Sequence, residues 1–213
     1  MTVQSVHNYS LIFLILLTLT AGSACFAGES ISEDQMTKMK EMVKSRFTRE
    51  STISAVSSDC RNPDKLELGM PVLEVILQEI KFASDRNTPA RISPYLTTQG
   101  IYAVPVIVDG KACYIVQFKC SVESVEHIGS IFSSTYAEQF VNVSKMIIEK
   151  KSLVERVVCL DTGMIQKIVV IYKDGTEEFH SLSPTTDPTP DSAAELRVFL
   201  RQVYKNQVFI PTK

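Results

Sequence analysis

Residues 101–119 read IYAVPVIVDGKACYIVQFK, and this stretch predicts the β-hairpin around which the rest of the fold is arranged. Two apolar runs, 101–108 and 111–119, flank the dipeptide Asp109-Gly110. A two-residue hairpin loop needs positive φ angles, which Asp and Gly adopt more readily than most residues. We therefore expect two antiparallel strands joined by a tight turn.

A second set of strands is predicted nearer the C-terminus, where short apolar segments alternate with turns that contain glycine. Gly163 follows Asp-Thr in a three-residue loop, and Gly175 lies in the turn Lys-Asp-Gly-Thr. The three segments form a meander, with strands over 154–160, 164–172 and 177–182.

Three segments combine an N-terminal capping box with apolar residues at helical spacing, and each predicts a helix. The capping residues are Ser32 with Gln35, Thr135 with Glu138, and Ser192 with Glu195. The stretch 72–82 is different, because its apolar run fits a buried strand and a helix equally well. Pro71 indicates only that a new element begins there.

The predicted order is a helix, an undetermined element, a hairpin, a helix, a three-stranded meander and a helix. This order indicates an α+β fold, an antiparallel sheet packed by about three helices in a single domain. Residues 28–67 would be an N-terminal helical segment and linker, and 68–213 the α+β domain. In general shape the arrangement resembles a small secreted domain of the cystatin-like or PepSY-like kind, without a family motif matched residue by residue.

The N-terminal region has the pattern of an export signal. The first 28 residues contain no Lys, Arg, Asp or Glu, and 11–17 is an unbroken apolar run. Such a run matches the hydrophobic region of a signal peptide and is shorter than the roughly 20 residues that span a bilayer. We expect a signal peptide over 1–27 and a periplasmic or secreted protein, with no transmembrane span after cleavage.

Two cleavage sites fit the small residues that follow the apolar run. Cleavage after Ala27 leaves a chain without an anchor. Cleavage after Ala24 leaves Cys25 at the N-terminus, where bacterial lipoproteins carry their lipid, and residues 22–25 (GSAC) resemble the lipobox of those proteins. The lipobox has Leu or a similar residue at the position of Gly22, so cleavage after Ala27 is preferred and a membrane-anchored lipoprotein is the alternative.

Outside the cytoplasm the remaining thiols, Cys60, Cys113, Cys120 and Cys159, can form disulfides. On one straight strand Cys113 and Cys120 are about 23 Å apart, too far for a bond that needs Cα atoms within about 7 Å. Two schemes with both bridges remain, 60–113 with 120–159, or 60–120 with 113–159. The bridge 120–159 is favoured because Cys120 ends a strand, and buried free thiols are the alternative.

The sequence contains none of the usual catalytic or ligand-binding motifs. It has no GxxxxGK[ST], GxGxxG or GxSxG, no CxxC, and no paired Cys or His at zinc-ligand spacing. We therefore expect no cofactor, no metal site and no catalytic residue. A formal net charge of −2 also argues against a nucleic-acid partner.

These observations predict an exported, non-enzymatic binding or structural envelope module with a protein partner. The runner-up is a thiol-dependent or hydrolytic envelope enzyme that uses a cysteine with His127 or His180. An apolar stripe on the first helix is a candidate partner surface, although such a stripe is more often core. It consists of Met36, Met39, Val43 and Phe47.

Overall fold

A single mixed sheet connects the two predicted sets of strands. The computed structural model describes residues 31–50, 60, 62–162, 165–182 and 189–207. In this part of the chain the strands are β1 (Leu66–Leu68), β2 (Val72–Leu77), β3 (Leu96–Val108), β4 (Lys111–Cys120), β5 (Val125–Ile131), β6 (Val154–Asp161), β7 (Gln166–Tyr172) and β8 (Glu177–Ser181). The helices are α2 (Glu33–Glu50), α3 (Glu79–Ser84), α4 (Ser134–Glu149) and α5 (Ala193–Gln207), with short 3-10 turns at Pro63–Lys65 and Ser93–Tyr95.

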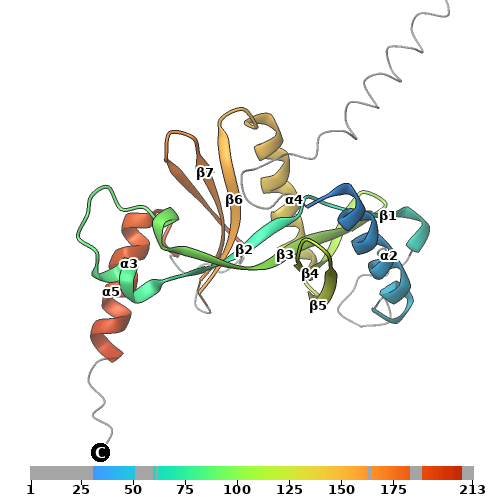
Figure 1. Ribbon diagram of the computed structural model, residues 1–213, viewed down its shortest axis with the longest axis horizontal. Helices are drawn as coiled ribbons and strands as arrows, with labels where there is room; N and C mark the ends of the chain where they lie inside the picture. Colours follow the sequence, from blue (N-terminus) through green and yellow to red (C-terminus); the bar gives the residue numbers. More distant parts are fainter. Residues whose placement is uncertain (1–30, 51–59, 61, 163–164, 183–188, 208–213) are drawn as a thin grey trace, which may run out of the picture.

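The strand order is β5-β4-β3-β2-β6-β7-β8, with β1 paired to the end of β3 (Figure 1). The predicted hairpin is confirmed, since β3 and β4 pair antiparallel and Asp109 and Gly110 have φ angles of 52° and 78°. Gly175 has a φ of 79° in the predicted turn between β7 and β8, whereas the turn at Gly163 lies outside the described residues. The predicted α+β class is therefore confirmed, and the sheet, predicted as antiparallel, is mostly so.

Strand β2 joins the hairpin to the meander, which the sequence did not predict. It pairs antiparallel with β3 and parallel with β6, where Leu73 lies opposite Val158. A parallel pair requires a long connection between its strands, and here that connection contains the whole hairpin, β5 and α4. Local patterns contain no information about such a distant pairing, so the sequence predicted an antiparallel sheet without the parallel pair that makes it mixed.

The undetermined stretch 72–82 contains both a strand and a helix. Its first part is β2, and the chain then turns at Gln78, whose N–H donates to the carbonyl of Tyr95 at 2.9 Å. Helix α3 follows and buries Phe82 and Ala83. The described chain thus has four α-helices rather than the three predicted.

The three predicted capping boxes have different outcomes. The box at Ser32 is confirmed, because its hydroxyl accepts from the N–H of Gln35 at 3.1 Å and the Gln35 side chain accepts from the Ser32 N–H at 2.8 Å. At α5, the Ser192 hydroxyl accepts from the Glu195 N–H at 3.2 Å. The predicted box at residues 135–138 is wrong, since the N-cap of α4 is Ser133.

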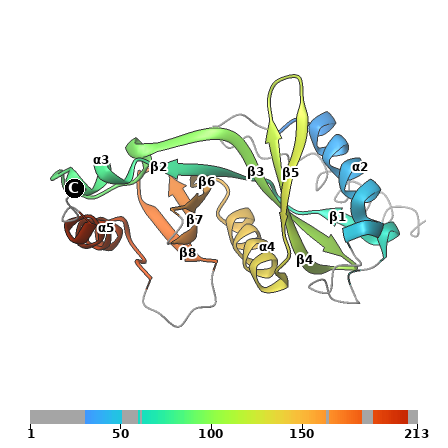
Figure 2. The same ribbon diagram turned by 90° about the horizontal axis from the view of Figure 1, so that it is seen from below.

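The sheet wraps around α4, and the other helices lie on its outer side. Figure 2 shows α4 between the β3–β5 half and the β6–β8 half, with α2 outside the first half and α5 outside the second. Three apolar clusters correspond to these layers: the α2 cluster with β3 and β4, the central cluster around α4, and the α5 cluster with α3, β6 and β7. The predicted N-terminal helical segment therefore packs into the same domain as the rest of the chain.

Candidate functional site

One of the predicted disulfides is present in the structure. Cys60 and Cys113 are bonded, with Cα atoms 5.9 Å apart, and both belong to the α2 cluster. The bond links the segment after α2 to strand β4. It is one of the two bridges in the favoured scheme, and the second bridge of that scheme is absent, because Cys120 and Cys159 are both free and buried.

The position of β2 explains why the predicted Cys120–Cys159 bridge is wrong. Strands β3 and β2 lie between β4 and β6. Three strand spacings of about 4.8 Å put the two cysteines about 14 Å apart, twice the reach of a disulfide. The two side chains also point to opposite faces, Cys120 into the α2 cluster and Cys159 into the central cluster.

Neither free thiol has the properties of a nucleophile. Burial raises the pKa of the Cys120 thiol to about 11. Burial also raises the pKa of Cys159, and the neighbouring charge of Glu74 raises it further. A reactive cysteine needs a pKa lowered toward neutrality, so both thiols are held in the protonated, unreactive form.

His127 comes closest to a free thiol, because it is a diagonal neighbour of Cys120 in the β4–β5 register. Its ring nitrogens contact other groups: Nδ1 lies 2.9 Å from Arg46 Nη1, and Nε2 lies 3.2 Å from Ser130 Oγ. The imidazole thus connects α2 to β5. Its described contacts do not orient it as a general base toward the thiol.

His180 lies on β8 and is separated from Cys159 on β6 by the intervening strand β7. Two strand spacings place their Cα atoms about 10 Å apart. The Nε2 atom of His180 lies 3.4 Å from the Glu178 carboxylate. Burial lowers the pKa of this imidazole, and the Glu178 charge raises it in part.

The stripe on the first helix is core and does not form the candidate partner surface. Met39, Val43 and Phe47 are at most 1% exposed, and Met36 packs partly buried against them. Their partners are the apolar residues of β3 and β4 that face α2. Of the two interpretations of this stripe, burial against the sheet is therefore the correct one.

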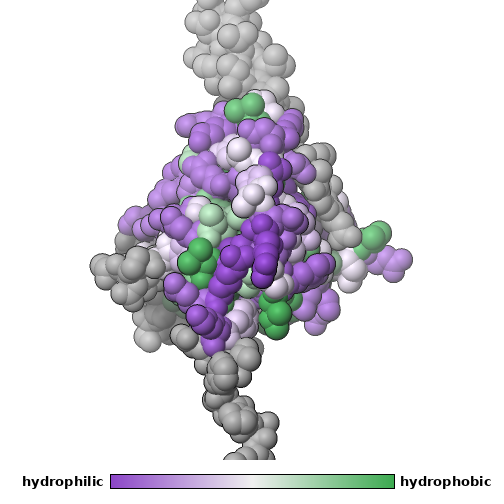
Figure 3. Space-filling model, turned by 90° about the vertical axis from the view of Figure 1, so that its left-hand side faces the viewer, coloured by the Kyte–Doolittle hydropathy of each residue, from purple (hydrophilic) through white to green (hydrophobic). Residues whose placement is uncertain are grey.

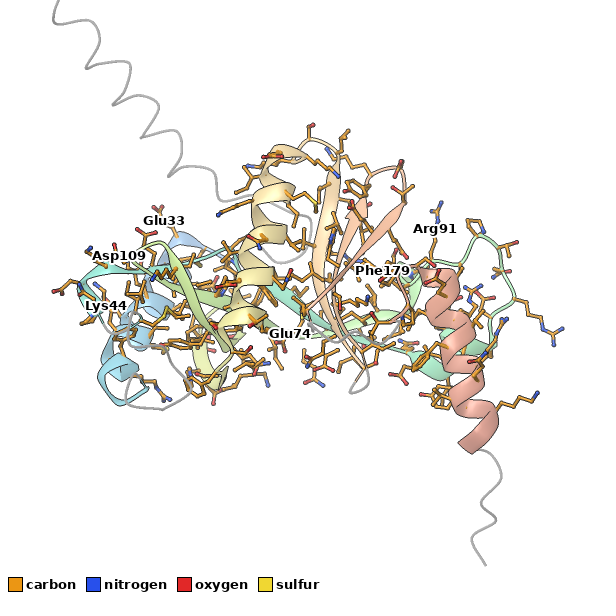
Figure 4. The ribbon with its side chains drawn as sticks, turned by 180° about the vertical axis from the view of Figure 1, so that it is seen from behind. Glu33, Lys44, Glu74, Arg91, Asp109 and Phe179 are labelled. Atoms are coloured by element: carbon orange, nitrogen blue, oxygen red, sulfur yellow. A yellow bond between two sulfur atoms is a disulfide. The ribbon has the colours of Figure 1, made fainter. Side chains whose placement is uncertain are left out.

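A half-buried carboxyl group lies at the centre of the sheet. Glu74 on β2 accepts a hydrogen bond of 2.6 Å from Gln117 Nε2, and burial raises the pKa of its carboxyl group. In Figure 4 it lies between the end that carries Lys44 and the end that carries Arg91. Within the described ranges, no group of three or more His, Cys, Asp or Glu side chains is placed to hold a metal ion.

A pocket that the sequence did not predict lies at the end of the molecule opposite α2, where α3 and α5 lie together (Figure 1). The pocket has a volume of about 570 Å³. Its ionisable lining residues are all arginines: Arg86 from the loop after α3, and Arg197 and Arg201 from α5. Ala83, Ser84 and Thr88 complete the lining.

Arg197 is held rigidly at the back of this arginine pocket. The residue is 5% exposed, and its guanidinium carbon lies 4.8 Å from the centre of the Phe82 ring. Nη1 donates to the carbonyl of Asn87 at 2.6 Å, and Nη2 lies 3.7 Å from the carboxylate of Asp85. Its Nε atom is buried and has no acceptor among the described residues.

Arg201, one helical turn further along α5, binds the end of α3. Its Nε donates to the Ala83 carbonyl at 2.6 Å, and its Nη2 donates to the Asp85 carbonyl at 2.5 Å. These carbonyls end a helix and would otherwise lack partners. The sequence contains one indication of this pair, because residues 197 and 201 are four positions apart and share a helix face. No pattern of neighbouring residues indicates that Arg86 lies close to them.

Comparisons with known proteins add no relative: no family model, no curated protein and no solved structure matches the chain. The cystatin-like or PepSY-like likeness in general shape stays a prediction. In the described part of the chain, no helix is long and apolar enough to cross a membrane.

Proposed function

We propose that the protein is an exported, non-enzymatic module that binds a partner outside the cytoplasm. The observation that carries the binding role is the arginine pocket, in which three arginines, two of them held by hydrogen bonds, line a cavity large enough for part of a ligand. Guanidinium groups bind carboxylates and phosphates and are always charged, so they suit recognition better than proton transfer.

The proposed location is supported by the Cys60–Cys113 disulfide. Structural disulfides persist in oxidising compartments such as the periplasm and the extracellular space, and they are rare in the cytoplasm. The export signal expected over residues 1–27 lies outside the described residues and supports the same location from the sequence. The anchored alternative, with lipid at Cys25, keeps the same binding role at a membrane surface.

The intact mass of the protein from its native host, combined with alkylation, tests this proposal. We expect a chain that starts at Gly28 and takes up no iodoacetamide while folded. Unfolding without reduction should expose two thiols, Cys120 and Cys159, and reduction should expose four. A start at Cys25 with added lipid mass would establish the lipoprotein form instead.

Two outcomes would overturn the proposal. An uncleaved chain with all cysteines reduced would place the protein inside the cell. Alkylation of a cysteine in the folded protein faster than that of a model thiol would favour the thiol-dependent enzyme. The alkylated residue would then identify the nucleophile to replace.

A further inference from the structure

The arginine pocket concentrates like charges with little compensation. Three guanidinium groups line it, and within the described part of the chain Asp85 is the carboxylate that contacts them, through Arg197. This carboxylate also accepts a hydrogen bond from the Tyr95 hydroxyl and one of 2.9 Å from the Asn87 N–H. Like charges that share a cavity repel one another, so a bound anion would stabilise the arrangement.

The guanidinium groups retain unused donors. Arg201 uses Nε and Nη2 on backbone carbonyls, and the N–H groups of its Nη1, which have no acceptor among the described residues, remain for a ligand. The buried Nε of Arg197 has no acceptor within the described chain. Arg86 is exposed at the rim, where its side chain can move toward a bound group. A buried donor without a partner is unfavourable, and a nearby negative charge reduces that penalty.

The two helical arginines are also preorganised. Backbone carbonyls of Ala83, Asp85 and Asn87 hold them at 2.5–2.6 Å, and the Phe82 ring packs against Arg197. A ligand that binds groups already fixed in place loses less of its binding free energy to ordering. Arg201 would contact the ligand. Arg197, buried at the back of the pocket, would attract the ligand mainly through its positive charge.

The size and polarity of the pocket limit the ligand. A volume of about 570 Å³ is in the range of small-molecule sites. Figure 3 shows the end of the molecule that carries α3 and α5, and its surface is mostly hydrophilic, with apolar residues only scattered over it. This surface does not suit an acyl chain or an apolar peptide.

We propose that the arginine pocket binds the oxyanion group, phosphate or carboxylate, of a small anionic ligand. Arg86 and Arg201 form the contacts, since guanidinium forks bind both groups in a bidentate manner. This inference rests on the proposed binding role and identifies the site and the ligand chemistry for it.

The test is a calorimetric titration of the mature protein with inorganic phosphate, pyrophosphate and citrate, each against sodium chloride at equal ionic strength. We expect one ligand per chain for at least one probe. Preference for pyrophosphate over citrate would identify a phosphorylated ligand, and the reverse preference a carboxylated one. Absence of binding for all three at about 10 mM would overturn the proposal, since a site with three arginines, two of them fixed in place, should reach this affinity.

Two matched variants show whether the arginine pocket is the site that binds the anionic probe. Arg86→Gln removes a rim charge whose side chain makes no hydrogen bond or ion pair with other described residues, so the protein should fold normally and bind the preferred probe about ten- to hundredfold more weakly. Arg91→Gln removes an equal charge that lies near Gly175, outside the pocket lining, and should leave affinity within about twofold. Equal weakening by both variants would show non-specific attraction and overturn the assignment.

The same experiments separate this inference from the proposed function. A protein that keeps its signal sequence and stays in the cytoplasm, yet binds pyrophosphate in an Arg86-dependent manner, would refute the export proposal and retain the anion site. An exported protein whose affinity for pyrophosphate is unchanged by Arg86→Gln would refute the anion site and retain the export proposal.

Discussion

The α2 end and the α5 end of the sheet differ in the groups that fix the covering helix in place. At each end a helix covers apolar side chains on the outer face of the sheet (Figure 2). At the α2 end a disulfide fixes the segment that follows the helix. At the α5 end the helix is fixed by guanidinium groups that donate to backbone carbonyls around α3.

The two solutions have different consequences for function. A disulfide satisfies both of its sulfur atoms and leaves nothing for a ligand to bind. An arginine has five N–H groups, and holding one or two of them on carbonyls leaves others available. The arginines that fix α5 to the end of α3 therefore also supply donors to the pocket at that end.

The largest effect is expected from truncation of the apolar core at either end. Phe47→Ala removes a ring that is 1% exposed in the α2 cluster and should lower the free energy of unfolding by about 3–5 kcal/mol. Leu200→Ala, fully buried at the α5 end, should cost about 2–5 kcal/mol. Urea denaturation measures both. A loss below 1 kcal/mol for Phe47→Ala would mean that packing of α2 against the sheet contributes little to the stability of the fold.

Removal of the disulfide should distinguish the two ends. The double variant Cys60→Ala/Cys113→Ala opens a loop with a sequence separation of 53 residues, and it should cost about 2–4 kcal/mol. A reducing agent should lower the stability of the wild type by a similar amount and leave the variant unchanged. Hydrogen exchange should increase in α2 more than in α5. Equal increases in both helices would show that the two ends are not fixed independently.

A smaller effect is expected from an ion pair near the start of α5. Lys167 on β7 is 1% exposed, and its ammonium group binds Asp191 at 2.8 Å and Thr189 at 2.9 Å. Asp191→Asn should cost about 1–2 kcal/mol, because it removes the charged partner of a buried ammonium group while leaving its hydrogen bonds largely in place.

The double variant Lys167→Met/Asp191→Asn is the control for this ion pair. Without the buried charge it should recover most of the lost stability, since methionine fills a similar volume and needs no partner. Thermal and urea unfolding both report the difference. If the single and double variants are equally unstable, packing around Lys167 and not its charge is responsible.

The parts of the fold that the sequence predicted are those determined by neighbouring residues. The Asp109-Gly110 turn and the Ser32 capping box depend on contacts within four positions, and both are confirmed. The parallel pairing of β2 with β6 depends on residues about 85 positions apart, and no local pattern indicates it. The same limit explains the error over Cys120 and Cys159, because β2, which separates the hairpin from β6, lies in the stretch that the sequence leaves undetermined.

The candidate site was missed for the same reason. Arg197 and Arg201 lie on a predicted helix, where exposed arginines are ordinary. Their partners, Arg86 and the carbonyls of Ala83 and Asp85, are more than 100 positions away and meet them only after α3 has formed from an ambiguous apolar run. Chemistry assembled from single residues of distant segments leaves no motif in the sequence.

The smallest predicted effect concerns His180 and sharpens the comparison by testing the edge strand β8, in the half of the sheet that α5 covers. Burial holds the pKa of its imidazole below 6.5, the value of an unperturbed histidine, so the folded protein favours the neutral ring. The unfolded chain takes up a proton first as the pH falls, and stability present above about pH 6.5 is therefore lost as the pH drops toward the lower folded pKa.

Urea unfolding between about pH 8 and 5.5 should show this decrease in the wild type and a flatter profile in His180→Gln. The neighbouring Glu178 has its pKa lowered, chiefly by the Tyr172 hydroxyl, so it stays charged throughout this range and does not contribute to the slope. Parallel profiles for the two proteins would show that the imidazole titrates as freely in the folded protein as in the unfolded chain.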